Sequence, residues 1–314
     1  MNIKEKVKIE FNDDFFKEEI KCDYKVTEKQ KRIWAIELDL MAQLLSVCKK
    51  HNIRIMVFAG TLLGAIRHKG FIPWDDDFDV CVLREDFEKL LKIAPDEFDE
   101  PYFLQSALSD RRYFMGYARL RNSLTTAHIL KYHSPEYNHG IYIDVYVLDG
   151  YVGEEKLLTK QLGRRDVIEK IANTYSKQDY TGNTISRFIK KLASSILHVT
   201  LCKWIKYETV VGWYVDTLSL YNEDSKYVTT VTHERKIVDS SLLEKAAFDD
   251  IIYMPFENIE VPVPADYDKI LSIKYGDYMK FPPKEKRGVW HTGVVDFEPD
   301  IEYKEYFKQK KNKK

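Results

Sequence analysis

The chain has 314 residues, of which 44% are hydrophobic and 13% aromatic, so it has enough apolar side chains for a sizeable core and too many for a disordered protein. Its formal net charge of -1 argues against a basic nucleic-acid-binding surface and against an acidic tail. The four cysteines are scattered and form no CxxC pair, which argues against a zinc knuckle and favours a reducing compartment. No apolar run approaches the ~18 residues of a membrane span or resembles a secretory signal, so a cytoplasmic protein is expected.

The first half of the chain alternates between predicted helices and strands. Thr27 and Gln30 form a capping box at the start of a helix whose apolar residues recur at helical spacing. Strict alternation makes 140–148 the clearest strand, with Tyr142, Asp144 and Tyr146 on one face. The elements predicted in this half are a helix at 27–50, a strand at 53–59, a short helix at 62–68 capped by Gly70, a strand at 78–83, a helix at 84–92, and strands at 102–105, 117–121 and 140–148.

The second half begins with a long, mainly helical stretch. The elements predicted there are helices within 154–220, strands near 227–232 and 251–261, and a helix at 266–275 capped by Gly276. This order predicts an α+β fold with a mixed β-sheet, flanking helices and a mainly helical insertion. The predicted organisation is a catalytic core at 27–150, a helical insertion or second lobe at 151–250, a segment returning to the core at 251–295, and a tail at 296–314 whose basic end, 308–314, is expected to be disordered.

Three carboxylates form the main candidate site. Asp77 and Asp79 lie at i and i+2 on a predicted strand, which points both to one face, roughly 6–7 Å apart. Asp144 lies inside an apolar strand, where an unpaired charge would be costly and a partner is required. Carboxylates in this pattern suit Mg²⁺, with Mn²⁺ as an alternative, and two such ions about 3.5–4 Å apart could clamp a phosphoryl group in transfer. Asp77, Asp79 and Asp144 are therefore the predicted catalytic and metal-binding residues, the alternative being a solvated acidic turn.

Upstream of these carboxylates, Gly60 and Thr61 lie at a strand-to-helix turn whose N–H groups can hold phosphate. The order Gly-Thr, then Asp-x-Asp, then a single strand Asp is the signature of the nucleotidyltransferase superfamily. A longer set of motifs resembles the LicD family of phosphorylcholine transferases, to which fukutin-type sugar-phosphate transferases are related. The matching segments are FAGTLLGAIRHKGFIPWDDDFDVCVLREDFEKL at 58–90, GIYIDVYVLDG at 140–150, VPVPADY at 261–267, YGDYM at 275–279, Pro282-Pro283 and His291.

The resemblance implies a nucleotidyltransferase-like core and a reaction class. Such enzymes transfer phosphorylcholine from CDP-choline to a sugar hydroxyl of a cell-surface glycan precursor, and CMP leaves. For this chain it implies a CDP-alcohol donor, CDP-choline being favoured, a glycan or lipid-linked glycan acceptor of teichoic acid, capsule or lipopolysaccharide type, and no nucleic-acid partner. The alternatives are a nucleotidyltransferase that modifies a small molecule or protein and releases pyrophosphate, and a binding module without activity.

The remaining candidate residues are expected to bind substrate. Arg67 could bind the donor diphosphate in a bidentate manner, and Tyr142 could contact a trimethylammonium group through its ring. Each has a structural alternative, such as a solvated helix end, a packed core tryptophan or a half-buried strand face. The predicted substrate-binding residues are Gly60, Thr61, Arg67, His68, Trp74, Arg119, Arg121, Tyr142 and His291.

Residues 187–206, RFIKKLASSILHVTLCKWIK, combine an apolar centre with basic ends. This pattern is typical of a helix lying in a membrane interface, and it would bring the protein to the inner face of the plasma membrane. The alternative is a core helix with solvated ends.

Overall fold

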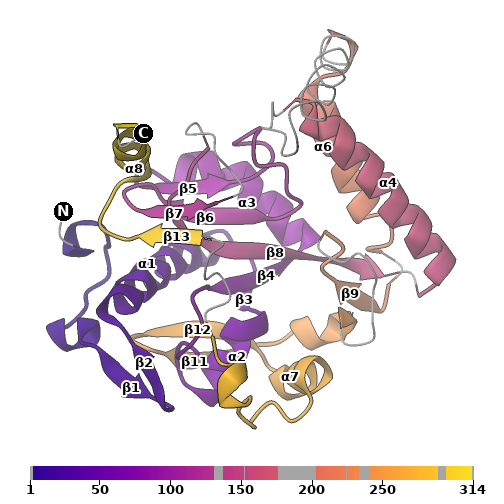
Figure 1. The fold of residues 1–314 in the computed structure, drawn as a ribbon. Helices are drawn as coiled ribbons and strands as arrows, with labels where there is room; N and C mark the ends of the chain where they lie inside the picture. The colour runs from indigo at the N-terminus through magenta and orange to yellow at the C-terminus, as the bar shows by residue number, and fades with distance from the viewer. Residues whose placement is uncertain are drawn as a thin grey trace.

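The computed structural model describes residues 3–130, 137–151, 153–175, 203–223, 225–232, 241–288 and 295–312 (Figure 1). The α-helices are α1 (Glu28–Lys50), α2 (Ala59–Arg67), α3 (Arg84–Glu97), α4 (Glu155–Asn173), α6 (Tyr207–Leu218), α7 (Tyr267–Tyr275) and α8 (Tyr303–Asn312). Short 3₁₀ helices are η1 (Ile3–Glu5), η2 (Asp13–Phe16), η4 (Lys245–Phe248) and η5 (Lys284–Lys286). The strands are β1 (Glu19–Lys21), β2 (Tyr24–Val26), β3 (Met56–Val57), β4 (Asp79–Leu83), β5 (Tyr102–Gln105), β6 (Ala118–Asn122), β7 (Thr126–Ile129), β8 (Ile141–Tyr151), β9 (Tyr227–Thr229), β10 (Leu243–Glu244), β11 (Ile251–Phe256), β12 (Ile259–Pro264) and β13 (Val295–Glu298).

Strand β8 organises the main sheet. It pairs in parallel with β4, and antiparallel with β6 and, at its far end, with β9. The strand order is β10-β9-β8-β4-β3, with β6 and then β5 joining on the other side of β8. This mixed sheet with its surrounding helices confirms the predicted α+β fold.

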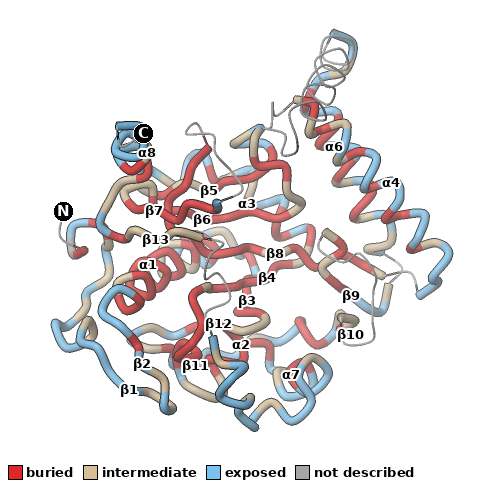
Figure 2. Tube along the Cα trace, viewed as in Figure 1, coloured by how far each residue is buried: buried red, intermediate tan, exposed pale blue. Residues whose placement is uncertain are grey.

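The two faces of the sheet have different partners. On β5, Tyr102 and Gln105 point to opposite faces, and the Tyr102 hydroxyl donates to Asp39 of α1 over 2.6 Å. Helix α1 therefore covers the face away from Gln105, and its Trp34, Leu38 and neighbouring apolar residues are fully buried there. Buried residues form a continuous block through the strands and α1 (Figure 2). The face that carries Gln105 is therefore the one opposite α1.

Helices α4 and α6 form a lobe that extends away from the sheet (Figure 1). They pack against each other around a separate cluster of buried apolar residues, including Leu162, Val210 and Leu218. Phe114 and Ala107, from the loop between β5 and β6, complete this second cluster and join the lobe to the sheet. None of the described helices is long and apolar enough to cross a bilayer. Most of the segment predicted to be an interfacial helix, 187–202, lies outside the described residues.

Close packing of α2 against the loop that follows it depends on Gly64. A Cβ atom there would lie 2.5 Å from the carbonyl oxygen of Gly70, which is a backbone atom and cannot yield easily. The tip of the β11–β12 hairpin holds the same loop, because the Glu257 N–H donates to the Lys69 carbonyl and its carboxylate accepts from the Phe71 N–H. The loop that leads to the aspartates is therefore fixed from both sides.

Several element predictions differ in detail from the structure. The strand expected at 53–59 is only Met56–Val57, because the chain turns at Ala59, whose φ is +46°, and α2 begins there. Helix α2 ends at Arg67 rather than at Gly70. Strands β7 and β13 were not predicted, and they pair with each other although they lie far apart in the chain. The basic end that was expected to be disordered is helical as far as Asn312.

Candidate active site

One row of polar residues crosses four neighbouring strands at the same level. Asp79 of β4 lies opposite Asp144 of β8, which lies opposite Arg119 of β6, which lies opposite Gln105 of β5. Residues directly opposite one another share a face of the sheet. All four are buried, with exposed fractions of 8% or less. The two predicted strand carboxylates, Asp79 and Asp144, are therefore immediate neighbours.

The Asp144 carboxylate has a cationic partner in Arg119. The Arg119 Nε and Nη2 atoms donate to its two oxygens over 2.6 and 3.4 Å. Nη2 also donates to the Tyr117 hydroxyl over 3.2 Å, and the guanidinium lies 3.9 Å from the centre of the Tyr142 ring. Such a two-pronged contact fixes the orientation of the carboxylate as well as compensating its charge.

Asp79 is held by its backbone and carries an unpartnered oxygen. Its N–H donates to the Thr61 hydroxyl over 2.8 Å, and its carbonyl accepts from the Phe58 N–H at the start of α2. Its Oδ1 atom is buried and has no hydrogen-bond partner. Burial, followed by the nearby charges of Asp77 and Asp144, raises the pKa of Asp79 well above its usual range. An orphaned, crowded carboxylate oxygen of this kind favours a bound cation.

A cavity of about 780 Å³ opens beside these aspartates. Asp75, Asp77 and Asp79 line its acidic wall, together with Gly60 of α2. A side chain at Gly60 would displace the Asp75 carboxylate, because a Cβ atom there would lie 2.8 Å from Asp75 Oδ2. Helix α2 begins at this wall with no side-chain cap on its N-terminus, so its first N–H groups contribute partial positive charge next to the carboxylates.

A cationic and aromatic wall completes the cavity. Arg67, Trp74, Lys280 and Lys286 line it, together with Tyr275 and Tyr278. The Arg67 guanidinium donates to the Tyr278 carbonyl over 2.8 Å, which ties the segment after α7 to α2. The cavity thus combines carboxylates that suit a divalent cation with cationic groups that suit phosphate.

The other residues predicted to bind substrate fall into two groups. Trp74 lines the cavity but is 95% buried. His68 accepts a hydrogen bond from Arg67 Nε, and its ring stacks on the Phe281 ring with the ring centres 5.4 Å apart. Both side chains therefore contribute to packing. Arg121 is fully buried and donates to the Gly140 carbonyl and the Gln105 side chain, so it supports the sheet.

Tyr142 and Thr61 both have partners within the protein. Tyr142 lies beneath the guanidinium groups of Arg119 and Arg121, at 3.9 and 4.6 Å from its ring centre, so its ring already has cationic neighbours. The Thr61 hydroxyl positions Asp79 rather than lining the cavity. His291 lies outside the described residues.

Two acidic residues near the site were missed by the sequence reasoning. Asp75 continues the i, i+2 spacing of Asp77 and Asp79, and this continuation could have identified it. Burial, followed by the charge of Asp77, raises its pKa well above the usual range. Glu37 of α1 is 1% exposed, and burial and the same aspartates raise its pKa as well. In the sequence, the available signal was a glutamate among the regularly spaced apolar residues of this helix, because a buried carboxylate requires polar surroundings.

The acidic wall offers oxygen ligands to a divalent cation. The buried Asp79 oxygen without a partner and the raised pKa values of Asp75 and Asp79 fit a hard cation that accepts oxygen ligands. Within the described residues, no group of three or more His, Cys, Asp or Glu side chains is placed to hold a metal ion by itself. Asp75, Asp77 and Asp79 line the cavity and would hold such an ion together with oxygens of the substrate, whereas Asp144 lies against Arg119.

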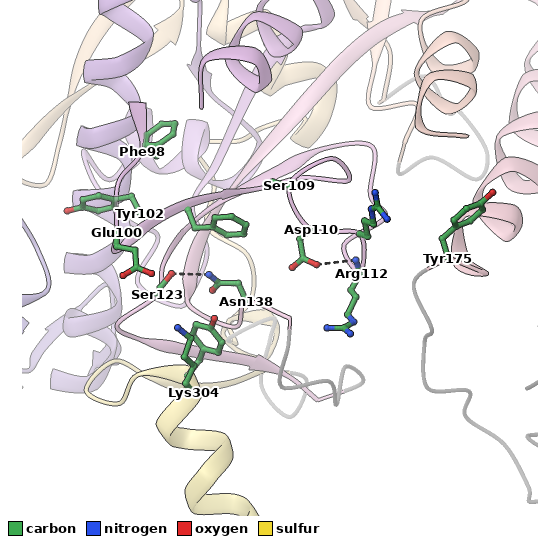
Figure 3. Close-up of a pocket in the computed structure, with 13 residues that line it drawn as sticks. Phe98, Glu100, Tyr102, Ser109, Asp110, Arg112, Ser123, Asn138, Tyr175 and Lys304 are labelled. Atoms are coloured by element: carbon green, nitrogen blue, oxygen red, sulfur yellow. Dashed lines mark hydrogen bonds between the residues drawn. The ribbon is translucent and has the colours of Figure 1, made fainter. Parts of the chain in front are cut away.

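A further cavity of about 600 Å³ lies where β5, the loop after it and α8 meet (Figure 3). Asp110 accepts there from the Arg112 N–H over 3.1 Å, and Asn138 donates to Ser123 over 2.9 Å. It is lined by none of the predicted site residues.

Comparison with known proteins identifies the domain. The family described as "LicD/FKTN/FKRP, nucleotidyltransferase domain" matches residues 52–169, which include the entire polar row and the acidic wall. A protein of Haemophilus influenzae named lipopolysaccharide cholinephosphotransferase LicD is 28% identical over 265 residues, covering 81% of this chain and 92% of that protein. Uncharacterized proteins of Rickettsia typhi and Rickettsia prowazekii are 40% and 45% identical over 73 and 56 residues, about a fifth of each chain. Residues 52–169 of this chain are therefore similar to the nucleotidyltransferase domain of the LicD/FKTN/FKRP family.

Proposed function

We propose that this protein is a phosphotransferase that moves a phosphorylated alcohol, phosphorylcholine in the favoured case, from a CDP-alcohol to a sugar hydroxyl of a cell-surface glycan precursor. The observation that carries the proposal is one cavity with an acidic wall of Asp75, Asp77 and Asp79 and a cationic wall that includes Arg67 and Lys280. The named relative is a lipopolysaccharide cholinephosphotransferase, which supports lipopolysaccharide as one acceptor class.

The bond changes follow from the donor chemistry. The acceptor hydroxyl oxygen attacks the phosphorus distal to the nucleoside, the bond from that phosphorus to the bridging oxygen breaks, and CMP leaves with that oxygen. A magnesium ion held by Asp75, Asp77 and Asp79 would supply charge neutralisation for the diphosphate. Arg67, Lys280 and Lys286 would bind the phosphate oxygens, and Asp144, oriented by Arg119, would receive the proton of the hydroxyl.

The reaction can be tested by identifying its products. Purified protein is incubated with Mg²⁺ and CDP-choline, CDP-ethanolamine, CDP-glycerol or CDP-ribitol, with lipopolysaccharide or teichoic acid as acceptor, and in parallel with CTP or ATP. We expect CMP from a CDP-alcohol and no pyrophosphate from either triphosphate. Asp79→Asn should abolish the release, whereas Asp96→Asn, at an exposed position on α3, should not. Pyrophosphate release without CMP would replace the proposal with nucleotidyl transfer.

A further inference from the structure

A cavity of about 490 Å³ lies where the two clusters of buried apolar residues meet. Phe114 and Tyr214 belong to the cluster of the α4–α6 lobe, whereas Tyr117 belongs to the cluster of the main sheet, and all three line this cavity. Junctions between two packed units are common positions for ligand sites. We call this space the junction cavity.

One stripe of α4 supplies the polar wall of the junction cavity. Leu162, Arg165, Glu169 and Asn173 recur at spacings of three or four residues, so they share a face of the helix. Arg165 is buried and donates to the Val231 carbonyl over 2.7 Å and to the neighbouring Asp166 over 2.8 Å. Glu169 and Asn173 are half-buried and also line the cavity. This wall offers both donors and acceptors.

The aromatic wall of the junction cavity is rigid. Phe114 packs edge-on against Tyr214 with ring centres 4.8 Å apart, and Tyr117 stacks on Tyr146 at 5.1 Å with nearly parallel planes. Aromatic rings cover the C–H faces of a sugar, while carboxylate and amide groups pair with its hydroxyls. A pocket with one wall of each kind has the chemistry to bind a carbohydrate.

Tyr117 links the junction cavity to the catalytic row. Its hydroxyl accepts from Arg119 Nη2 over 3.2 Å, and the same nitrogen lies 3.4 Å from Asp144 Oδ2. The junction cavity therefore ends two hydrogen bonds from Asp144, whereas the cavity of the proposed donor lies at Asp79 on the neighbouring strand. Phosphoryl transfer requires the attacking and leaving oxygens on opposite sides of the phosphorus. Separate cavities for the acceptor and the donor are compatible with that requirement.

From this geometry we infer that the junction cavity binds a sugar unit of the acceptor, with Glu169 and Asn173 pairing with its hydroxyls and Tyr117 directing the reacting end toward Asp144. The inference rests on the proposed phosphotransferase function for its role in catalysis. Sugar binding itself can be measured without turnover.

The binding test uses saturation-transfer NMR with galactose, glucose, N-acetylgalactosamine and N-acetylglucosamine at millimolar concentration as probes. We expect the wild-type protein to bind at least one of them, and Glu169→Gln and Asn173→Ala to weaken that binding about tenfold or more, the effect of losing a hydrogen bond to a charged or buried group. The matched control is Glu155→Gln, at an exposed position on the same helix, which should leave binding unchanged. Thermal melting of each variant shows whether the fold is retained.

The inference is overturned if wild type binds none of the four sugars, or if both α4 variants bind as wild type does. It is also overturned if Arg112→Ala, in the cavity of Figure 3, abolishes binding while the α4 variants retain it. With a working transfer assay, Glu169→Gln should raise KM for the acceptor and leave KM for the donor unchanged. A wild-type protein that binds sugar but releases no CMP would contradict the proposed function and leave the sugar site standing.

Discussion

At the scale of single residues, Asp79 combines a structural disadvantage with a proposed catalytic role. Its carboxylate is buried among Asp75, Asp77 and Asp144, and one of its oxygens has no partner. Like charges in low-dielectric surroundings destabilise the folded state unless a cation neutralises them. The residue should therefore cost stability in the apo protein and restore it when a cation binds.

Asp79→Asn tests this trade-off directly. We expect turnover to fall on the order of 10²–10⁴-fold, the range for loss of a main catalytic group. In EDTA the variant should melt at a higher temperature than wild type, because a neutral amide removes the repulsion. Adding Mg²⁺ should raise the melting temperature of wild type more than that of the variant, since only binding to the folded state stabilises it. Calorimetric melting curves with and without Mg²⁺ measure both effects. If Mg²⁺ raises the melting temperature of wild type and variant by the same amount, a metal role for Asp79 is contradicted.

His68 gives the protein a predictable pH dependence. Burial, followed by the positive charges of Arg67 and Lys21, lowers the pKa of His68 from 6.5 to about 4. Between these values the unfolded chain binds a proton that the folded chain does not, so the free energy of unfolding should fall as pH drops from about 6.5 to about 4. His68→Gln should flatten that part of the curve. Urea titrations across this range measure the slope, and an unchanged slope in the variant would assign the effect to other groups.

At the scale of elements, the N-terminal turns of α1 support the acidic loop. The Gln30 side-chain amide donates to the carbonyls of Pro73 and Asp75 over 2.8 and 3.2 Å, and the Trp34 indole N–H also donates to Asp75 over 3.2 Å. The capping box predicted at this point is confirmed for Thr27, which accepts from the Gln30 N–H. The Gln30 side chain, however, points to the loop rather than back to the cap.

Gln30→Ala should therefore affect both stability and activity. Leaving the Pro73 carbonyl without its donor costs about 1–3 kcal/mol, and a loosened loop should weaken the response to Mg²⁺. Gln43→Ala, a half-buried glutamine on the same helix, is the control and should change neither property appreciably. Denaturant unfolding and a Mg²⁺ titration of activity provide the two measurements. Wild-type behaviour of Gln30→Ala in both would show that α1 does not hold the loop.

The sequence predicted local elements well and long-range pairing poorly. Alternation in β8 identified the face of Asp144 correctly, and the period-two spacing placed Asp79 on a strand. The partner of Asp144 could not be read from spacing, because Arg119 reaches it only through the antiparallel register of β6 and β8. Likewise, β7 and β13 lack a local strand pattern and become strands only by pairing with each other.

At the scale of the whole molecule, two clusters of buried residues differ in size. The main cluster spans the sheet, α1 and α2, whereas the cluster of the α4–α6 lobe is much smaller and joins the sheet through Phe114 and Ala107. Ile3 and Val26, which precede the predicted core at 27–150, are part of the main cluster. The second lobe was predicted from its helical pattern, but its attachment through the β5–β6 loop was not visible in the sequence.

The unequal clusters predict unequal local stability. Segments with few buried contacts open at lower free energy than the main core. Native-state hydrogen exchange should show amides of α4 and α6 exchanging well before those of β4 and β8. Equal protection across both parts would mean that the lobe and the sheet unfold as one cooperative unit.

The tight packing at Gly64 has a consequence for mutational scanning. Any side chain at this position would strike the Gly70 carbonyl and displace the loop that leads to the aspartates. In a saturation library selected for activity, Gly64 should therefore tolerate as few replacements as Asp79, although it is not among the residues that line the cavity. A heat map of such a library would rank the two positions together, and only expression level or melting temperature would separate the residue that shapes the site from the residue that acts in it.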